Sequence, residues 1–253
     1  TFPMKGGSMS SSSSQSLHAV SYHKYIVSHK FEGIPIMYRD DYILRMIAQF
    51  GAIIRHILGL YREGKSPLVR IAIDNAYRDR LGVGSDRIAT LSDQQLLALL
   101  RFHHRSEEWW VEGAYLAALL TTESRLFADD GEMEEAATRA LLALQLVIEC
   151  RLAAPEDVPD YIPDYAVLLD LLRDYVLPTP TLAALFTLCE QNGDLARSED
   201  LLHELISRDR AGWLATARAF YTRLLSQDDQ VLDAGGLSRA EVLTALAELD
   251  RPG

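Results

Sequence analysis

The spacing of apolar residues constrains this chain more than any other feature, because it keeps a helical period almost throughout. From residue 41 onward, apolar side chains recur at steps of three and four positions. The clearest series contains Ile43, Met46, Ile47, Phe50, Ile53, Ile54, Ile57 and Leu58. With 48% hydrophobic residues, the chain has enough apolar material for a packed core. The pattern therefore predicts an all-α protein without a convincing strand.

Turn residues divide this pattern into helices that are expected to pair as antiparallel hairpins. Three hairpin turns are expected, at Gly64, Asp129-Asp130-Gly131 and Gln191-Asn192-Gly193-Asp194. Ser92 with Gln95 and Ser238 with Glu241 have the spacing of capping boxes, which begin helices. About ten helices are predicted, over residues 41–63, 68–81, 92–100, 107–127, 133–152, 165–176, 182–189, 195–206, 211–226 and 238–249.

The hairpin turns recur at a regular interval along the sequence. Gly64 and Gly131 are 67 residues apart, and Gly131 and Gly193 are 62 apart. Both separations are near two periods of about 34 residues, the period of tetratricopeptide (TPR) repeats. The best-matching copy contains Leu120, Ser124, Phe127, Gly131, Ala136 and Ala143. The small side chains of that copy favour close contact between its two helices, and the other copies match more loosely.

Several segments resemble a known family over residues 37–250. They are the opening Arg39–Ile47 and, near the end, Ala219-Phe220-Tyr221, Leu224-Leu225, Asp233–Arg239 and Glu241-Val242. These segments are similar to those of an uncharacterised bacterial family of TPR-like helical repeat proteins. The resemblance implies a TPR-like right-handed superhelix of antiparallel helix hairpins. It implies no particular activity.

The first 36 residues differ in composition from the rest of the chain. A Gly/Ser-rich stretch over residues 6–16 is followed by a basic aromatic segment that includes Lys24 and Lys30. Its longest apolar run is residues 25–27, whereas a secretory signal needs about 7–15 apolar residues. We interpret residues 1–36 as a flexible Ser-rich tail or a non-native leader, and residues 37–253 as a single TPR-like α-helical repeat domain.

The charge balance excludes several classes of partner. Lys and Arg total 25 against 36 Asp and Glu, a net charge of -11, which disfavours nucleic acid and anionic membranes. Charged residues such as Arg45 and Arg55 interrupt the apolar segment 43–58, so no membrane insertion is expected. Two cysteines, Cys150 and Cys189, are too few for a disulfide scaffold, which favours a cytoplasmic protein.

Three polar clusters suggest metal binding or catalysis, and each has a simpler interpretation. They are His103-His104 with Glu107 and Glu108, the acidic turn Asp129–Glu135, and the carboxylates Glu156, Asp157, Asp160 and Asp164. The first lacks the HExxH order, and the second lacks the alternating ligands of a calcium loop. The third lies on a Pro-rich connector where solvation is expected. No phosphate-binding loop is present, so we expect no metal, no cofactor and no catalytic residue.

Aromatic residues are the strongest candidates for partner binding. Trp109 and Trp110 are adjacent, and one helix cannot bury both indoles on the same face. With Tyr115, and with Tyr161 and Tyr165 at lower priority, they are expected to anchor a protein or peptide, because exposed Trp and Tyr often do so.

These features together predict a non-catalytic protein–protein interaction scaffold or adaptor that binds a protein segment on its helical-repeat surface. The acidic field is expected to select basic partners, and assembly into a homo-oligomer stays open. The alternative is an enzyme or a small-ligand-binding protein with a pocket between helices, which would need a convergent polar site.

Overall fold

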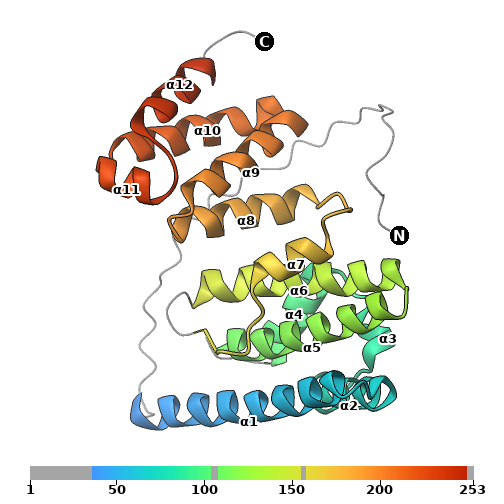
Figure 1. The fold of residues 1–253 in the computed structure, drawn as a ribbon. Coiled ribbons are helices and arrows are strands. Elements are labelled where there is room, and N and C mark those ends of the chain that lie inside the picture. The colour runs from blue at the N-terminus through green and yellow to red at the C-terminus, as the bar shows by residue number, and fades with distance from the viewer. Residues whose placement is uncertain (1–35, 104–107, 155–157, 250–253) are drawn as a thin grey trace. The chain divides into compact units, whose positions relative to one another are not determined.

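The computed structural model describes residues 36–103, 108–154 and 158–249, and these residues form twelve α-helices and no β-strand (Figure 1). The prediction of an all-α fold is confirmed. The described chain divides into two compact units, of which the first ends at Val176 and the second begins at Leu177. That residues 37–253 act as one domain stays a prediction.

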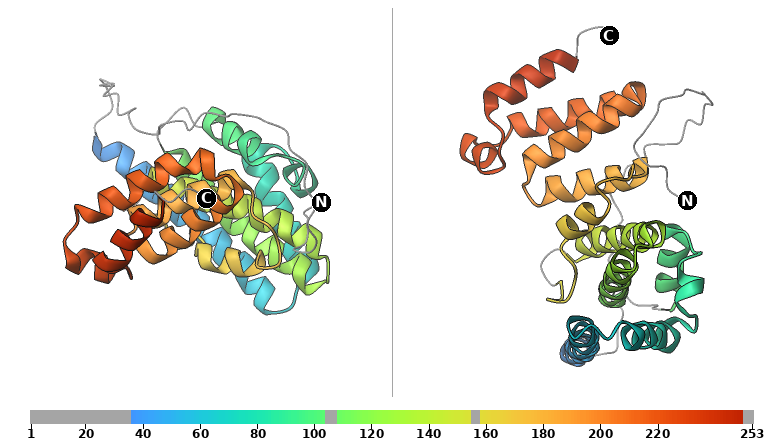
Figure 2. Two further views of the ribbon diagram at one scale, coloured as in Figure 1. Left: turned by 90° about the horizontal axis from the view of Figure 1, so that it is seen from above. Right: turned by 45° about the vertical axis from the view of Figure 1, so that its right-hand side comes forward.

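Two antiparallel hairpins form most of the first unit. Its helices are α1 (Ile36–Arg62), α2 (Ser66–Leu81), α3 (Ser85–Ile88), α4 (Asp93–His103), α5 (Trp109–Asp129), α6 (Met133–Ala153) and α7 (Tyr165–Leu171). Helix α1 pairs with α2 and α5 pairs with α6, as Figures 1 and 2 show. Helix α5 also contacts α1, α2 and α4. It is therefore the central helix of this unit.

Close packing in the first unit depends on small residues at the contact between α5 and α6. A Cβ atom added to Gly113 would lie 2.6 Å from the Sγ atom of Cys150, so no larger residue fits there without movement. The Ser124 hydroxyl donates a hydrogen bond to the carbonyl oxygen of Ala136 at 2.7 Å. Ala136 and Ala143 are both buried, which agrees with the close helix contact that the repeat pattern predicted.

The second unit contains the remaining five helices. They are α8 (Thr179–Gln191), α9 (Leu195–Arg208), α10 (Arg210–Leu225), α11 (Asp229–Ala234) and α12 (Arg239–Leu249). Helices α8 and α9 form a hairpin, and α10 packs against both α9 and α12. Phe220 lies at the centre of this core, where its ring contacts Phe186 at 5.4 Å and Tyr221 at 5.2 Å between centroids.

The three predicted hairpin turns share one backbone geometry. Gly64, Gly131 and Gly193 have φ angles of 68°, 80° and 74°, the left-handed region in which a glycine carries no Cβ penalty. In each turn, the next residue donates its N–H to the carbonyl five residues earlier: Lys65 to Leu60, Glu132 to Phe127 and Asp194 to Cys189. This Schellman geometry satisfies carbonyls that the helix end would leave unpaired.

The predicted helix count and two helix boundaries need correction. Helix α1 begins at Ile36 rather than at residue 41. Twelve helices replace the expected ten or so, because α3 and α11 span only 4 and 6 residues and show no full apolar period. Helix α7 ends at Leu171 rather than at residue 176. The chain turns there, and the Tyr175 hydroxyl donates to the carbonyl oxygen of Met133 at 3.1 Å, so a contact between distant segments overrides the helical pattern.

The capping box predicted at the start of α4 is confirmed. The Ser92 N–H donates to Oε1 of Gln95 at 2.9 Å, and the Gln95 N–H donates back to the Ser92 hydroxyl at 3.2 Å. Two N–H groups at the helix start are thus satisfied reciprocally.

Helix α1 is the one helix in the described residues that is long and apolar enough, over Asp41–Arg62, to cross a membrane. A core helix of a soluble protein meets the same criterion. Phe50, Ile54 and Ile57 on α1 are buried within the first unit. The expectation of no membrane insertion stays a prediction.

Candidate functional site

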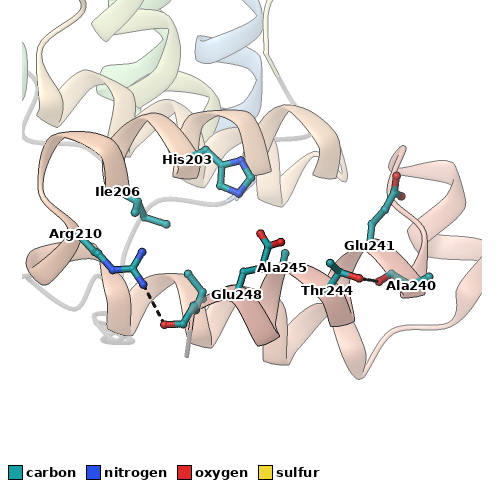
Figure 3. Close-up of a pocket in the computed structure, with 9 residues that line it drawn as sticks. His203, Ile206, Arg210, Ala240, Glu241, Thr244, Ala245 and Glu248 are labelled. Atoms are coloured by element: carbon teal, nitrogen blue, oxygen red, sulfur yellow. Dashed lines mark hydrogen bonds between the residues drawn. The ribbon is translucent and has the colours of Figure 1, made fainter. Parts of the chain in front are cut away.

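A groove in the second unit is the best candidate for a binding site. It has a volume of about 450 Å³ and lies between α9, the start of α10 and α12 (Figure 3). Its lining consists of His203, Ile206, Arg210, Ala240, Glu241, Thr244, Ala245, Glu248 and Leu249. Small and apolar side chains alternate along it with charged ones, so it offers both an apolar surface and fixed charge.

One end of the groove is closed by the junction of α9 and α10. Asp209 alone separates the two helices, and its Oδ1 atom accepts a hydrogen bond from the Gly212 N–H at 2.9 Å, which caps α10. This cap fixes Arg210 at the first position of α10. The Arg210 guanidinium donates to the carbonyl oxygen of Leu249 at 3.2 Å and so joins α10 to the end of α12 (Figure 3).

The other side of the groove is formed by α12, whose start is the second predicted capping box. The Ser238 N–H and hydroxyl both donate to Oε2 of Glu241 at 2.8 Å, and the Glu241 N–H donates to the Ser238 hydroxyl at 3.3 Å. These bonds lower the pKa of Glu241, and the bond from the Ser238 backbone N–H contributes most. Glu241, Ala245 and Glu248 are four and three residues apart, which places them on one face of the helix.

The buried side chain of Tyr221, on α10, contacts two residues of α9 beside the groove. The Tyr221 hydroxyl donates to Oε1 of Glu199 at 2.9 Å and lies 3.2 Å from Nε2 of His203. Both contacts are hydrogen bonds when Nε2 carries the proton, because the hydroxyl has only one proton of its own. Burial, and then Glu199, raise the pKa of Tyr221, so this phenol stays protonated near neutral pH. The arrangement fixes the direction of the His203 ring.

The chemistry of the groove suits binding better than catalysis. The carboxylates of Glu241 and Glu248 and the imidazole of His203 lie on exposed side chains. The pKa of Glu241 is lowered by its bonds from Ser238, whereas a carboxyl that acts as a general acid needs a raised pKa. Within the described residues, no group of three or more His, Cys, Asp or Glu side chains could hold a metal ion.

The predicted partner-binding aromatic residues lie in the first unit, in or near its core. Trp110 and Tyr115 are 9% and 1% exposed. Trp109, Tyr161 and Tyr165 are half-buried. The Tyr115 ring stacks on Phe50 at 4.2 Å with an interplanar angle of 15°, and burial raises its pKa to about 12. The structure brings Trp109, Trp110 and Tyr115 onto α5 but leaves little of the Trp110 and Tyr115 side chains exposed.

The two indoles avoid competing for one face because α5 is covered on several sides. Trp110 lies in the core, while the Arg101 guanidinium lies over the Trp109 ring, 4.9 Å from its centroid. The Tyr161 hydroxyl is buried without a hydrogen-bond partner in the described residues, and burial raises the pKa of Tyr161.

Several residues of the polar clusters suggested by the sequence have structural partners. In the acidic turn, Asp129 accepts from the Tyr61 hydroxyl at 2.7 Å, and Asp130 pairs with Arg70 at 2.6 Å, so the turn is attached to α1 and α2. Asp164 caps α7 by accepting from the Ala166 N–H at 2.9 Å. His104, Glu107, Glu156 and Asp157 lie outside the described residues.

Both cysteines are buried free thiols. Burial, the largest cause, raises the pKa of Cys150 far above the range of a reactive thiol. This thiol is therefore a small apolar group in the contact between α5 and α6.

Sequence reasoning missed every residue of the groove. A local signal exists, because Glu199 and His203 are four residues apart on α9 and Glu241, Ala245 and Glu248 share a face of α12. The sequence does not show that these two faces lie opposite each other, since more than 35 residues separate them. Only the packing of α10 against both helices brings them together.

The fold and the groove define an all-helical protein built from antiparallel hairpins, with an open acidic groove in its second unit. The chain belongs to a family of unknown function, DUF6483, whose family model matches residues 37–252. This agrees with the resemblance to an uncharacterised family over residues 37–250, and it carries no TPR identity. No curated protein and no solved structure is significantly similar to the chain.

Proposed function

We propose that this protein is a non-catalytic interaction scaffold or adaptor, and that it binds a protein segment in the groove between α9 and α12. The single observation that carries the proposal is this open groove, in which Ile206, Ala240 and Ala245 form an apolar floor between charged rims. Peptide segments are commonly recognised by helical grooves that combine an apolar floor with a polar rim. We also propose a cytoplasmic location, for which the two free thiols give support.

We further propose that the hairpins stack as a TPR-like right-handed superhelix. Support comes from the common Schellman geometry at Gly64, Gly131 and Gly193 and from the small residues where α5 meets α6. A crystal structure of residues 37–253 would test the arrangement directly. A left-handed or globular packing of the two units would refute it.

The binding function is tested by selecting peptides from a random display library on the full chain. Selected peptides are then measured against an Ala245→Phe variant, which fills the groove, and against Thr244→Phe as a second blocking variant. Far-UV circular dichroism and the urea midpoint confirm that each variant is folded. We expect peptides that bind the unmodified chain and lose affinity for both variants. Peptides that bind all three proteins equally would refute the groove as the site.

The second candidate function, small-ligand binding, is favoured by one observation, the fixed His203–Tyr221–Glu199 arrangement beside the groove. A fragment screen by ligand-observed NMR, with the Ala245→Phe variant as control, separates it from peptide binding. This alternative would be favoured by fragments that bind the unmodified chain but not the Ala245→Phe variant, provided that no selected peptide depends on the groove.

A further inference from the structure

The charges around the groove indicate what kind of segment it accepts. Between residues 177 and 249 the chain carries eleven carboxylates and six arginines, a net charge of -5, and no lysine. Three of the carboxylates, Glu199, Glu241 and Glu248, line the groove or support it from α9. The field at this surface therefore attracts cations.

The arginines near the groove are already counted in this net charge of -5, and they bond to groups other than Glu248. Arg210 donates to the carbonyl oxygen of Leu249, and Arg208 pairs with Glu204 at 2.6 Å. Arg239 donates to the carbonyl oxygens of Leu225 and Gln227 at 2.8 and 2.5 Å and pairs with Asp229. These guanidinium groups fix helix ends.

Glu248 is the carboxylate best placed to receive a cation. Its side chain points from α12 across the groove toward α9 and the His203 ring (Figure 3). It makes no hydrogen bond or ion pair with any residue in the described part of the chain, whereas Glu199 and Glu241 accept bonds from Tyr221 and Ser238. Its ionised oxygens thus keep their full capacity to accept hydrogen bonds from a ligand.

The apolar floor beside Glu248 fits the rest of a long basic side chain. Ile206 and Ala245 line the groove next to Glu248, and neither carries a polar side-chain atom. Lys and Arg commonly lay their aliphatic stems on apolar surface while the charged head reaches a polar partner. A neutral head group can donate a hydrogen bond to Glu248 but gains no ion pair with it, and an acidic head group is repelled by it.

We propose that the segment bound in this groove carries a lysine or arginine, whose stem lies on Ile206 and Ala245 and whose charged head pairs with Glu248. This inference rests on the proposed function, and it adds the chemistry of the partner: a basic protein segment. Glu241, seven residues and two turns earlier on the same face of α12, provides a second acidic contact for a further basic residue.

The test uses the groove-dependent peptides selected on the full chain, together with a Glu248→Gln variant and an Asp200→Asn control. Asp200 is exposed on α9 and does not line the groove, so its replacement removes the same formal charge elsewhere. Affinity is measured by fluorescence anisotropy at low and high salt. Each peptide is also made with its basic residue replaced by glutamine.

We expect the selected peptides to be enriched in lysine or arginine. Glu248→Gln is expected to weaken their binding by about five- to tenfold at low salt, and by about twofold or less at high salt, because screening removes most of an exposed charge interaction. The Asp200→Asn control should change affinity less than about twofold. Glutamine in place of the basic residue should produce the same loss as Glu248→Gln, and the two changes together should add little.

Two other outcomes would overturn this inference, and they differ in what they mean for the proposed function. Groove-dependent peptides without basic enrichment, bound equally well by Glu248→Gln, would overturn this inference and leave the proposed function standing. If no peptide depends on the groove, as judged with Ala245→Phe and Thr244→Phe, the proposed function and the inference both fail.

Discussion

The buried ion pair between Glu123 on α5 and Arg139 on α6 gives the sharpest prediction about stability. Both side chains are at most 6% exposed, and the Arg139 Nε atom lies 3.7 Å from Oε2 of Glu123. The same carboxylate accepts hydrogen bonds from the hydroxyls of Tyr77, at 3.2 Å, and Ser85. Burial raises the pKa of Glu123, and the Ser85 bond and Arg139 oppose this shift. Removing Arg139 therefore leaves a buried carboxylate without a cation on its α6 side.

The expected cost of Arg139→Met follows from the two states open to Glu123. Breaking a buried ion pair while the carboxylate stays ionised costs about 3–5 kcal/mol. Protonating it instead, from an unfolded pKa of about 4.3, costs about 5 kcal/mol at pH 8 and about 2 kcal/mol at pH 6. The protein takes the lower value, so we expect a loss of about 3–5 kcal/mol at pH 8 and about 2 kcal/mol at pH 6.

The sign of the pH dependence is a separate check. A carboxyl whose folded pKa is raised contributes stability that is present below its unfolded pKa and is lost as the pH rises through its folded pKa. Arg139→Met raises the folded pKa of Glu123 further. The variant should therefore lose stability between pH 6 and pH 8 more steeply than the unmodified protein.

Urea denaturation followed by tryptophan fluorescence measures these changes in the first unit alone if Trp213, on α10, is replaced by phenylalanine in every protein. The remaining indoles, Trp109 and Trp110, both lie on α5. The isoelectric point is near 5.1, so both pH values keep the protein negatively charged and soluble.

The double variant Glu123→Gln/Arg139→Met tests whether the loss comes from the unpaired charge of Glu123. Glutamine can accept from one of the Tyr77 and Ser85 hydroxyls and donate an N–H to the oxygen of the other, and it carries no charge. The double variant should therefore recover most of the loss and show no added pH dependence. Additive losses, or an Arg139→Met loss that is equal at pH 6 and pH 8, would refute the reasoning.

Three further predictions test other parts of the structure. Gly131→Ala should destabilise the protein by about 1 kcal/mol, because the φ of Gly131 is 80° and lies in the left-handed region. Gly59→Ala, inside α1 with open space around the new methyl group, should stabilise the protein by up to about 1 kcal/mol. The midpoints of urea denaturation measure both changes. The Cys150 thiol should resist Ellman's reagent at pH 8 until the protein is unfolded, since burial raises its pKa and blocks access; fast modification of the native protein would contradict its placement. Ser238→Ala should raise the pKa of Glu241, which the Ser238 bonds lower. The stability linked to Glu241 is present above its unfolded pKa and is lost as the pH falls through its folded pKa, and an NMR titration of its carboxyl carbon measures the shift.

Local features of the fold could be predicted from the sequence because their causes are local. The capping boxes at Ser92 and Ser238 and the turn at Gly131 each depend on residues within about one helical turn. The helix α7 was predicted too long because its end is set by Tyr175, which bonds to Met133, 42 residues away. Interactions of that range leave no periodic mark on the sequence.

The candidate site shows the same division. The i to i+4 spacing of Glu199 and His203 is visible in the sequence, but the opposing face of α12 is not. The aromatic candidates show the opposite case, in which the sequence suggests a binding role and the structure places the residue in the core. Trp110 and Tyr115 are typical anchor residues by type, yet α5 is surrounded by α1, α2, α4 and α6, and its aromatic side chains contribute to the core.

The use of arginine in this protein strengthens the case for a basic partner. Four of the basic residues are lysine and 21 are arginine, and between residues 36 and 253 the only lysine is Lys65. Arginines lie over aromatic rings at Arg70, Arg80, Arg101 and Arg139, with distances of 4.4 to 4.9 Å to the centroids. Planar guanidinium groups stack on rings and fork to carbonyls and carboxylates in ways that lysine does not. Near the groove, Arg210 and Arg239 are bonded to backbone carbonyls, while Glu248 has no hydrogen-bond or ion-pair partner among the described residues, so its carboxylate can pair with a basic residue of a partner.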